Sequence, residues 1–269
     1  MTILVTGATG NIGRRVVDHL VAAGAPAVRA LTVDPGRAAL PAGVEVARGS
    51  LRRLDTLPAA LEGVDRMYLA PLAETVVDAL ALARQAGVAH VVDLSGEHET
   101  WWGDVTRAVE ASGIEWTHLW PGDFMENSLS WAPGIAAERT VREPYPQGRS
   151  APTAMDDIAR VAAAALLTDA HLGAPLSLTG PEVLSRVELA QRIGDALGEP
   201  VSFETVSRDQ AVAEMSASMG EHAAWYVDTV LAGLVDNPAE VTTTVADVTG
   251  APATTFAQWA IENVAAFRG

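Results

Sequence analysis

Short apolar runs alternate with amphipathic segments through the first half of the chain. Six runs have the length and composition of buried strands, at 2–6, 28–32, 44–47, 66–69, 90–94 and 116–120. Three segments between them carry apolar residues at helical spacing and are each followed by a glycine, at 11–23, 74–86 and 104–112. Strands separated by helices require parallel crossovers. The pattern therefore predicts an α/β fold with a doubly wound parallel sheet.

The regular alternation ends after Trp120, where five prolines interrupt a stretch of little periodicity. Further helices are expected at 156–167, 185–197, 207–234 and 255–267, and short strands at 176–178 and 201–206. We therefore predict a nucleotide-binding domain over 1–150 and a smaller, mainly helical substrate-binding part over 151–269. The second part is expected to be interleaved with the first.

A glycine-rich loop, Gly-Ala-Thr-Gly-Asn-Ile-Gly, joins the first expected strand to the first expected helix. Glycines at such a turn let the backbone approach a pyrophosphate, and the helix N-terminus adds N–H groups and a partial positive charge. Because strand, loop and helix occur in the required order, we predict a dinucleotide site, with a tight turn that binds nothing as the alternative. The expected contacts are Gly7, Thr9, Gly10, Asn11, Ile12 and Gly13.

The residues after the second expected strand bear on which dinucleotide is bound. A carboxylate there binds a ribose 2′-hydroxyl, whereas an arginine accepts a 2′-phosphate. Arg37 follows Asp34, and Arg14 follows the glycine loop, although Asp34 also suits the start of an Asp-Pro-Gly turn. The two arginines favour NADP, and NAD stays an alternative. Residues near the ends of further strands are expected to complete the cofactor site: Ser50, Leu51, Ala70, Pro71, Ser95 and Pro121.

The amino-acid composition excludes several classes of enzyme and of binding site. All 18 basic residues are arginine, and the chain has neither lysine nor cysteine. The missing lysine excludes Schiff-base enzymes, P-loop NTPases that need a phosphate-contacting lysine, and reductases with a Tyr-x-x-x-Lys pair. The missing cysteine excludes thiol catalysis, disulfides and cysteine-ligated zinc.

The net charge of −16 argues against a nucleic-acid partner, because no basic cluster is available to neutralise phosphates. No apolar run reaches the length of a membrane span, and the first residues lack the charged region of a signal peptide. A cytoplasmic protein without a membrane partner is expected. The oligomeric state stays open, with a homodimer as one alternative.

Seven short motifs cover nearly the whole chain, at 6–13, 34–38, 86–88, 112–117, 121–127, 157–159 and 178–182. Together they resemble the NmrA-like atypical short-chain dehydrogenases/reductases. The resemblance implies an extended Rossmann fold that binds NAD(P)H. Members of that family include quinone and azo reductases, and redox-sensing regulators that bind dinucleotide without turnover. The chain departs from the family pattern at Val33 and Trp120, where relatives often have arginine, and at Ser50, where an acidic residue is common.

The absence of lysine also narrows the range of acceptors that a reductase of this kind can use. Ordinary short-chain reductases protonate an alkoxide with a tyrosine whose pKa a nearby lysine lowers, and the three tyrosines here fall outside the expected segment. A quinone needs less help, because its reduction product is a stable phenolate. We expect an apolar pocket for a flat aromatic acceptor, with simple packing as the alternative role of the same residues. Those residues are Trp101, Trp102, Phe124 and Met125.

Two residues after the fifth expected strand are candidates for the chemistry itself. Ser95 could hydrogen-bond an acceptor carbonyl, with a simple turn role as the alternative, and His98 is the best proton-donor candidate, with an ordinary surface histidine as the alternative. A metal site is not expected, since the acidic residues beside His98 are sequence neighbours without a partner motif. His90 and His118 alternate with apolar strand residues, so we expect both to be satisfied groups at the edge of the core rather than catalysts.

These observations favour an NAD(P)H-dependent reductase that transfers hydride to a quinone or related polycyclic aromatic acceptor. One alternative is a dinucleotide-binding redox sensor that controls a protein partner without turnover. A further alternative is a reductase of a conjugated C=C or imine bond.

Overall fold

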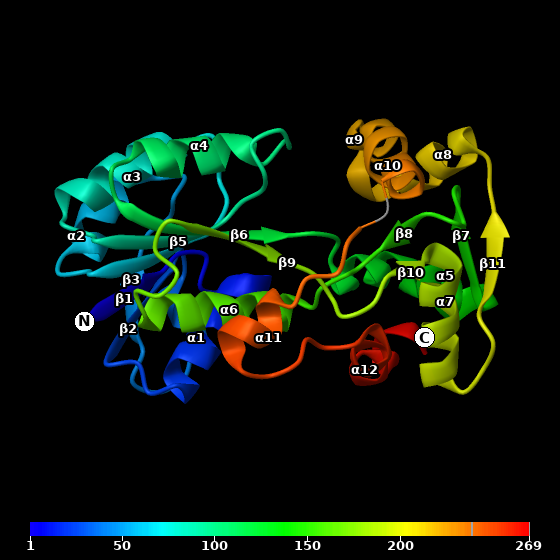
Figure 1. Ribbon diagram of the computed structural model, residues 1–269, viewed down its shortest axis with the longest axis horizontal. Helices are drawn as coiled ribbons and strands as arrows, with labels where there is room; N and C mark the ends of the chain where they lie inside the picture. Colours follow the sequence, from blue (N-terminus) through cyan, green and yellow to red (C-terminus); the bar gives the residue numbers. More distant parts are fainter. Residues whose placement is uncertain (238, 269) are drawn as a thin grey trace. The chain divides into compact units, whose positions relative to one another are not determined.

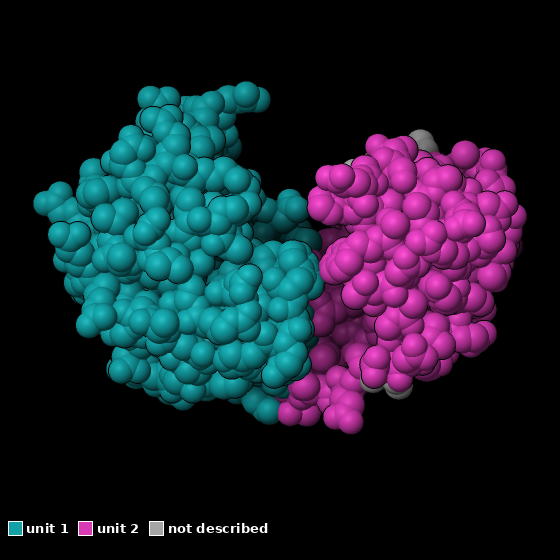
Figure 2. All heavy atoms as spheres, turned by 90° about the horizontal axis from the view of Figure 1, so that it is seen from above, with its two compact units in different colours: residues 1–121, 155–178, 244–251 teal, residues 122–154, 179–243, 252–269 magenta. Residues whose placement is uncertain are grey.

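The computed structural model describes residues 1–237 and 239–268, which form two compact units (Figure 1; Figure 2). Unit 1 comprises residues 1–121, 155–178 and 244–251, and unit 2 comprises 122–154, 179–243 and 252–269. This division differs from the boundary expected at residue 150. Residues 155–178 belong to unit 1, because they form a strand of its sheet and a helix that packs against that sheet. Residues 122–150 belong to unit 2.

Unit 1 is built on a seven-stranded sheet in the order β3-β2-β1-β4-β5-β6-β9, with every neighbouring pair parallel. The strands are β1 Thr2–Val5, β2 Ala27–Thr32, β3 Glu45–Arg48, β4 Arg66–Leu69, β5 His90–Leu94, β6 Glu115–Pro121 and β9 Ala174–Leu178. The strand order reverses between β1 and β4, which is where ligands bind at the carboxyl edge of open α/β sheets. The predicted doubly wound parallel sheet is confirmed.

Helices cover both faces of this sheet (Figure 1). One face carries α1 and α6, with α11 against them, and the other carries α2, α3 and α4. Their bounds are α1 Asn11–Ala22, α2 Leu57–Leu61, α3 Val76–Gln85, α4 Gly103–Ala111, α6 Met155–Leu167 and α11 Thr244–Thr249. Leu4, Leu61, Leu80 and Val91 belong to one buried cluster between the sheet and the second group of helices. Burying such side chains stabilises a fold by about 1.5–3 kcal/mol each.

Unit 2 is mainly helical and carries two small two-stranded sheets, β7 with β11 and β8 with β10. Its helices are α5 Ala132–Glu138, α7 Arg186–Leu197, α8 Arg208–Met219, α9 His222–Trp225, α10 Ala232–Asp236 and α12 Phe256–Glu262. Its strands are β7 Thr140–Glu143, β8 Arg149–Ser150, β10 Leu184–Ser185 and β11 Ser202–Thr205. Phe256 and Trp259 lie in its core, and Ser185 caps α7 through a reciprocal capping box with Glu188. Within the described residues, no helix is long and apolar enough to cross a membrane.

His90 of β5 is buried and only half satisfied. Its Nε2 lies 3.0 Å from Oγ1 of Thr117, which itself donates to the carbonyl oxygen of His171 and therefore accepts from Nε2–H. Nδ1 has no hydrogen-bond partner among residues 1–237 and 239–268. The prediction that His90 is a satisfied histidine is therefore wrong for Nδ1. Burial, together with the nearby positive charge of Arg66, lowers the pKa of His90 from 6.5 to about 4, while Asp169 opposes the shift.

This lowered pKa predicts a loss of stability in acid. Between pH 6.5 and about 4 the unfolded chain binds a proton at His90 that the folded chain does not, so the stabilisation is complete above pH 6.5 and declines as the pH falls. We expect about 2 kcal/mol to be lost from this residue by pH 4.5. Urea unfolding at pH 7.5 and 4.5 measures it, with His90→Gln as the variant that cannot titrate. An equal pH dependence in both proteins would contradict the prediction.

Candidate functional site

The glycine loop of unit 1 forms a cradle that only glycine can line. Gly7, at the end of β1, has φ of +59°, and the N–H of Gly10 donates to its carbonyl oxygen at 2.8 Å. A Cβ on Gly13 would lie 2.2 Å from that same oxygen. Within the described chain, no side chain caps the start of α1 at Gly10, so its first N–H groups remain available. The geometry fits a bound pyrophosphate, as expected for the loop.

Thr6 joins the two strands at which the sheet order reverses. Its hydroxyl donates to the carbonyl oxygen of Tyr68 at 2.9 Å and accepts from the N–H of Ala70 at 2.8 Å. A Cβ on Gly7 would lie 3.0 Å from the Cβ of Ala70, so the loop and the end of β4 are in close contact. The structure thus brings Ala70 to the glycine loop. The role of Thr6 was missed, because a threonine at the end of a strand carries no distinctive sequence signal.

The three residues expected to distinguish NADP from NAD differ in how far other residues already engage their side chains. Arg14 is held by Asp18, with Nε 3.2 Å from both carboxylate oxygens, and its Nη1 lies 3.4 Å from the carbonyl oxygen of Ala38. Asp34 precedes a short 3₁₀ helix, Pro35–Arg37, without capping it through its side chain. Arg37 is exposed and has no ion-pair or hydrogen-bond partner for its side chain in the described ranges. Arg37 is therefore the arginine free to meet a phosphate.

Other residues expected at the cofactor are engaged locally. The N–H of Ser50 donates to Oγ1 of Thr56 at 3.1 Å, and the Ser50 hydroxyl accepts from the N–H of Arg52 at 3.2 Å. The carbonyl oxygen of Leu51 accepts from Oγ1 of Thr75 at 2.8 Å. The remaining expected contacts lie at the carboxyl edge of the sheet or at the start of α1. Thr9 lies in the glycine loop, Asn11 and Ile12 begin α1, Pro71 follows β4 and Pro121 ends β6.

Ser95 directly follows β5 at this edge. Its N–H donates to the carbonyl oxygen of Leu119 at 3.0 Å, which extends the pairing of β5 with β6 by one residue. Only 4% of Ser95 is exposed, and its hydroxyl has no hydrogen-bond partner among the residues described. A buried hydroxyl without a partner is costly, which makes Ser95 a candidate for contact with a ligand.

A buried carboxylate–imidazole pair lies beneath α4, and the pattern of the two strands alone did not reveal it. Nδ1 of His118 lies 2.6 Å from Oδ2 of Asp93, and both side chains are fully buried. The two residues are register partners on β6 and β5. Burial raises the pKa of Asp93, and its contact with His118 opposes that rise. Within residues 1–237 and 239–268, Nε2 of His118 has no hydrogen bond, so the expectation of a fully satisfied His118 is also wrong.

Glu110 of α4 links this pair to His98. Its Oε1 lies 3.7 Å from Nε2 of His118, and its Oε2 lies 2.9 Å from Nε2 of His98. The rings of Trp116, His118 and Trp120 stack along one face of β6, with centroid separations of 4.0 and 5.8 Å. The side chains of Asp93, His118, Glu110 and His98 thus follow one another from the interior of unit 1 to its surface.

The expected acceptor residues fall in both units. In unit 1, Trp101 is 65% exposed and its ring centroid lies 4.1 Å from that of half-buried Trp102. In unit 2, Phe124 is half-buried and Met125 is 1% exposed within a hydrophobic core. The position of Met125 is that of a packing residue, because Leu189 and Trp259 belong to the same core.

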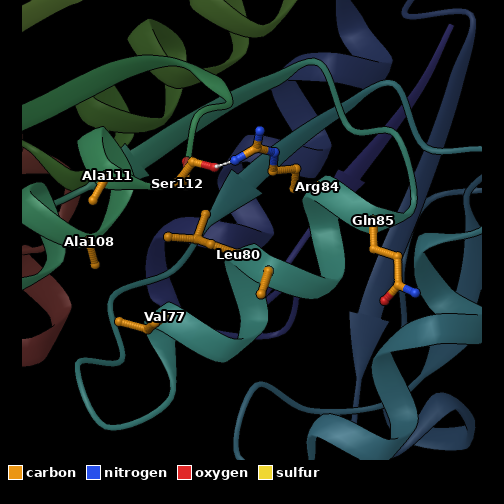
Figure 3. Close-up of a pocket in the computed structure, with 8 residues that line it drawn as sticks. Val77, Leu80, Arg84, Gln85, Ala108, Ala111 and Ser112 are labelled. Carbon is orange, nitrogen blue, oxygen red and sulfur yellow. Dashed lines mark hydrogen bonds between the residues drawn. The ribbon is translucent and has the colours of Figure 1, made fainter.

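A groove between α3 and α4 lies outside all these positions (Figure 3). It is lined largely by small apolar side chains, and Arg84 closes one end by donating to the carbonyl oxygen of Ser112 at 3.0 Å. None of the residues expected at the cofactor or acceptor lines it. Among the residues that the structure describes, no group of three or more His, Cys, Asp or Glu could hold a metal ion.

Comparison with known proteins identifies the family. A family described as NAD(P)H-binding matches residues 7–169. An NAD(P)H azoreductase of Xenophilus azovorans and a (4-alkanoyl-5-oxo-2,5-dihydrofuran-3-yl)methyl phosphate reductase of Streptomyces griseus are each 36% identical, over 98% of this chain and 99% of the relative.

Solved structures agree on the fold. An NADPH-dependent quinone oxidoreductase of Escherichia coli, solved with NADPH, has a TM-score of 0.86 at 24% identity, over 97% of this chain and 99% of that one. A triphenylmethane reductase of Citrobacter has a TM-score of 0.85 at 19% identity, over 98% and 99% of the two chains. The chain therefore belongs to the NAD(P)H-binding family, among the NmrA-like atypical short-chain dehydrogenases/reductases.

Proposed function

We propose that this protein is an NAD(P)H-dependent reductase that transfers hydride to a quinone or a related polycyclic aromatic acceptor without a Tyr/Lys pair. The observation that carries the proposal is the glycine loop before α1, where a Cβ on Gly13 would overlap the backbone of Gly7 and no side chain of the described residues caps the helix start. Relatives whose names specify azo and quinone reduction support a conjugated, electron-poor acceptor. The absence of lysine from the whole chain argues for an acceptor that needs no lysine-assisted proton donor.

The chain's own residues have three tasks in this reaction. Backbone N–H groups at the start of α1 hold the pyrophosphate, and the β1–β4 junction tied by Thr6 keeps the cradle in place. Ser95 presents a hydroxyl at the carboxyl edge of β5 to orient an acceptor oxygen. Trp101 and Trp102 supply flat apolar surface for an aromatic ring. When bound, NAD(P)H supplies the hydride.

NADPH is the proposed preferred cofactor, and Arg37 is the residue that we assign to the 2′-phosphate. Its guanidinium is exposed near the end of β2, where this phosphate is recognised in related folds. We expect Arg37→Ala to weaken NADPH binding about 10- to 100-fold, since a charge-assisted hydrogen bond contributes about 1.5–3 kcal/mol, and to leave NADH binding unchanged. Fluorescence titration with both cofactors measures the effect, with exposed Arg192→Ala as control. Equal losses for NADH and NADPH would contradict the assignment.

A second candidate acceptor is a conjugated C=C bond. The Streptomyces griseus relative is named for reduction of an alkanoyl-substituted oxo-dihydrofuran, in which a ring double bond is conjugated with carbonyl groups. Hydride addition to such a system also yields a stabilised oxygen anion, so the same residues suffice.

Steady-state oxidation of NADPH against benzoquinones, naphthoquinones, an azo dye and an alkanoyl butenolide tests the proposal. We expect turnover with at least one quinone, at a rate that depends on quinone structure. Tight NADPH binding without turnover of any acceptor would overturn the reductase and favour the redox sensor. Turnover of the butenolide alone would transfer the proposal to the second candidate.

A further inference from the structure

We propose that Asp93, His118, Glu110 and His98 form a proton relay that runs from the protein surface to the hydroxyl of Ser95. The inference rests on the proposed reductase function and states how that reaction obtains its proton. The relay takes the place of the Tyr/Lys pair, whose lysine this sequence cannot supply. All the residues involved belong to unit 1.

The outer half of the relay opens to solvent. His98 lies in the loop after β5 with 43% of its side chain exposed, and its Nε2 is 2.9 Å from Oε2 of Glu110. A third of the Glu110 side chain is exposed, and its other oxygen is 3.7 Å from Nε2 of fully buried His118. One carboxylate therefore faces both an exposed and a buried imidazole. The 3.7 Å separation is longer than a hydrogen bond, so Glu110 must move towards His118 to pass a proton inwards.

The inner half ends at the carboxyl edge of the sheet. Nδ1 of His118 is 2.6 Å from Oδ2 of Asp93, and Ser95 lies two residues after Asp93, on the same face of the sheet. Oδ1 of Asp93 and Oγ of Ser95 are both buried, and neither has a hydrogen-bond partner elsewhere in the described parts of the chain. Ser95 lies close enough to help lower the pKa of Asp93 against the effect of burial.

A purely structural role accounts poorly for this arrangement. A buried Asp–His pair costs several kcal/mol of desolvation per charge, and apolar residues of similar volume would often stabilise the fold at least as well. Here the pair also leaves Nε2 of His118 without a hydrogen bond within the described residues. The stacked Trp116 and Trp120 rings hold His118 in one orientation, which suits a group that must transfer a proton in a fixed direction.

Few other ionisable groups face the relay. Tyr68 of β4 interacts with Asp93, and burial together with the Asp93 charge raises the pKa of Tyr68, so it stays protonated. Arg107 of α4 donates to the carbonyl oxygen of His98 at 2.6 Å and pairs with Asp104. Both contacts of Arg107 lie at the solvent-exposed end of the relay and hold the loop that carries His98.

The proton balance of the reaction is simple. Reduction of a quinone adds two electrons and two protons, and the hydride brings both electrons and one proton. The acceptor oxygen is left as an anion and takes the proton of the Ser95 hydroxyl, as Asp93 returns a proton to Ser95. His118 reprotonates Asp93 from Nδ1 while its Nε2 takes up a proton that arrives from solvent through His98 and Glu110. Return of the imidazole to the Nδ1–H tautomer then resets the relay. No net charge remains on the relay.

The first test measures the relay without turnover. ¹⁵N NMR of histidine-labelled protein at one fixed pH is expected to show that Glu110→Gln changes the ring-nitrogen signals of both His98 and His118, because Glu110 lies near Nε2 of each ring. The signals of His90 are expected to stay unchanged. Unchanged signals of His98 and His118 in Glu110→Gln would overturn the relay.

The second test measures proton delivery during turnover. His118→Asn retains an N–H in the position of Nδ1 but cannot carry a proton inwards. We expect its kcat to fall about 100-fold, the range of general acid catalysis, with NADPH affinity unchanged and the solvent isotope effect on kcat increased. Ser95→Ala is expected to match it, and His90→Gln, a buried histidine on the opposite face of the same sheet, is expected to keep full kcat. Circular dichroism melting verifies that each variant is folded.

The outcomes separate the two proposals. Normal kcat and an unchanged isotope effect in folded His118→Asn would overturn the relay and leave the reductase intact. If the unmodified protein turns over no acceptor, the reductase fails, and the NMR comparison still decides whether Glu110 links the two imidazoles.

Discussion

Replacing Gly13 with alanine is expected to raise the Kd for NADPH at least about 100-fold, which corresponds to about 2.7 kcal/mol. The added Cβ would lie 2.2 Å from the carbonyl oxygen of Gly7 and 2.7 Å from its carbonyl carbon. Both are backbone atoms of the loop itself, so no side-chain rotation relieves the contact. The loop must move away from α1, and the N–H groups that hold the pyrophosphate lose their geometry. Isothermal titration calorimetry with NADPH measures the change.

Two other glycines provide graded controls for this prediction. A Cβ on Gly10 would lie 3.2 Å from the Gly7 oxygen, so Gly10→Ala is expected to weaken binding by a smaller factor. A Cβ on Gly233 of α10 would meet no atom within 4 Å in the described part of the chain, so Gly233→Ala should bind NADPH normally. If Gly13→Ala bound NADPH as well as Gly233→Ala does, the loop would not be the cofactor site.

Replacing Arg186 with methionine is expected to destabilise unit 2 by about 3–5 kcal/mol. Arg186 begins α7 and is almost fully buried, and its Nε and Nη2 donate to the two oxygens of Glu143 at 2.8 Å each. Trp131 donates its indole N–H to Glu143 at 2.7 Å, and the Arg186 guanidinium lies 4.5 Å over the Trp131 ring. Without the arginine, Glu143 keeps a buried charge with a single remaining N–H donor. The midpoint of urea denaturation measures the loss.

The cause of that loss can be separated from simple loss of packing. The double variant Glu143→Gln with Arg186→Met removes the charge and keeps an acceptor for the Trp131 N–H, so we expect it to recover much of the stability. Arg142 makes a similar bond to Glu204, at 2.8 Å, on the exposed side of the same strand. Arg142→Met should change the midpoint little, because solvent screens that pair. Equal effects at positions 142 and 186 would show that burial is not the cause.

The sheet of unit 1 could be predicted from sequence because its signals are local. Each strand is a short apolar run, each crossover helix has its own periodicity, and the glycine loop joins β1 to α1 without any distant contribution. Strand β7 was not predicted, because it pairs in parallel with β11 about 60 residues later and lies in a proline-rich stretch. Its strand character depends on that distant partner rather than on its own pattern.

The polar groups of the site were harder to predict than the loop. Asp93 and His118 each stand in an apolar strand, and only the register of β5 with β6 shows that they are opposite one another. Glu110 lies on α4, where it looks like any exposed helical glutamate until the helix packs over the sheet. Met125 was predicted to line the acceptor pocket, but it lies in the core of unit 2. That position depends on residues far along the chain. Spacing in sequence carries no information on such pairings.

The division of the chain between its two units has a consequence for dissection. The backbone passes from one unit to the other at five junctions, after residues 121, 154, 178, 243 and 251. A fragment that ends near residue 150 would lack β9 and α6, and so would expose an edge of the sheet and the face that α1 and α6 share. Neither unit can be produced as a single continuous piece of the chain. Domain exchange with relatives must therefore replace several segments at once.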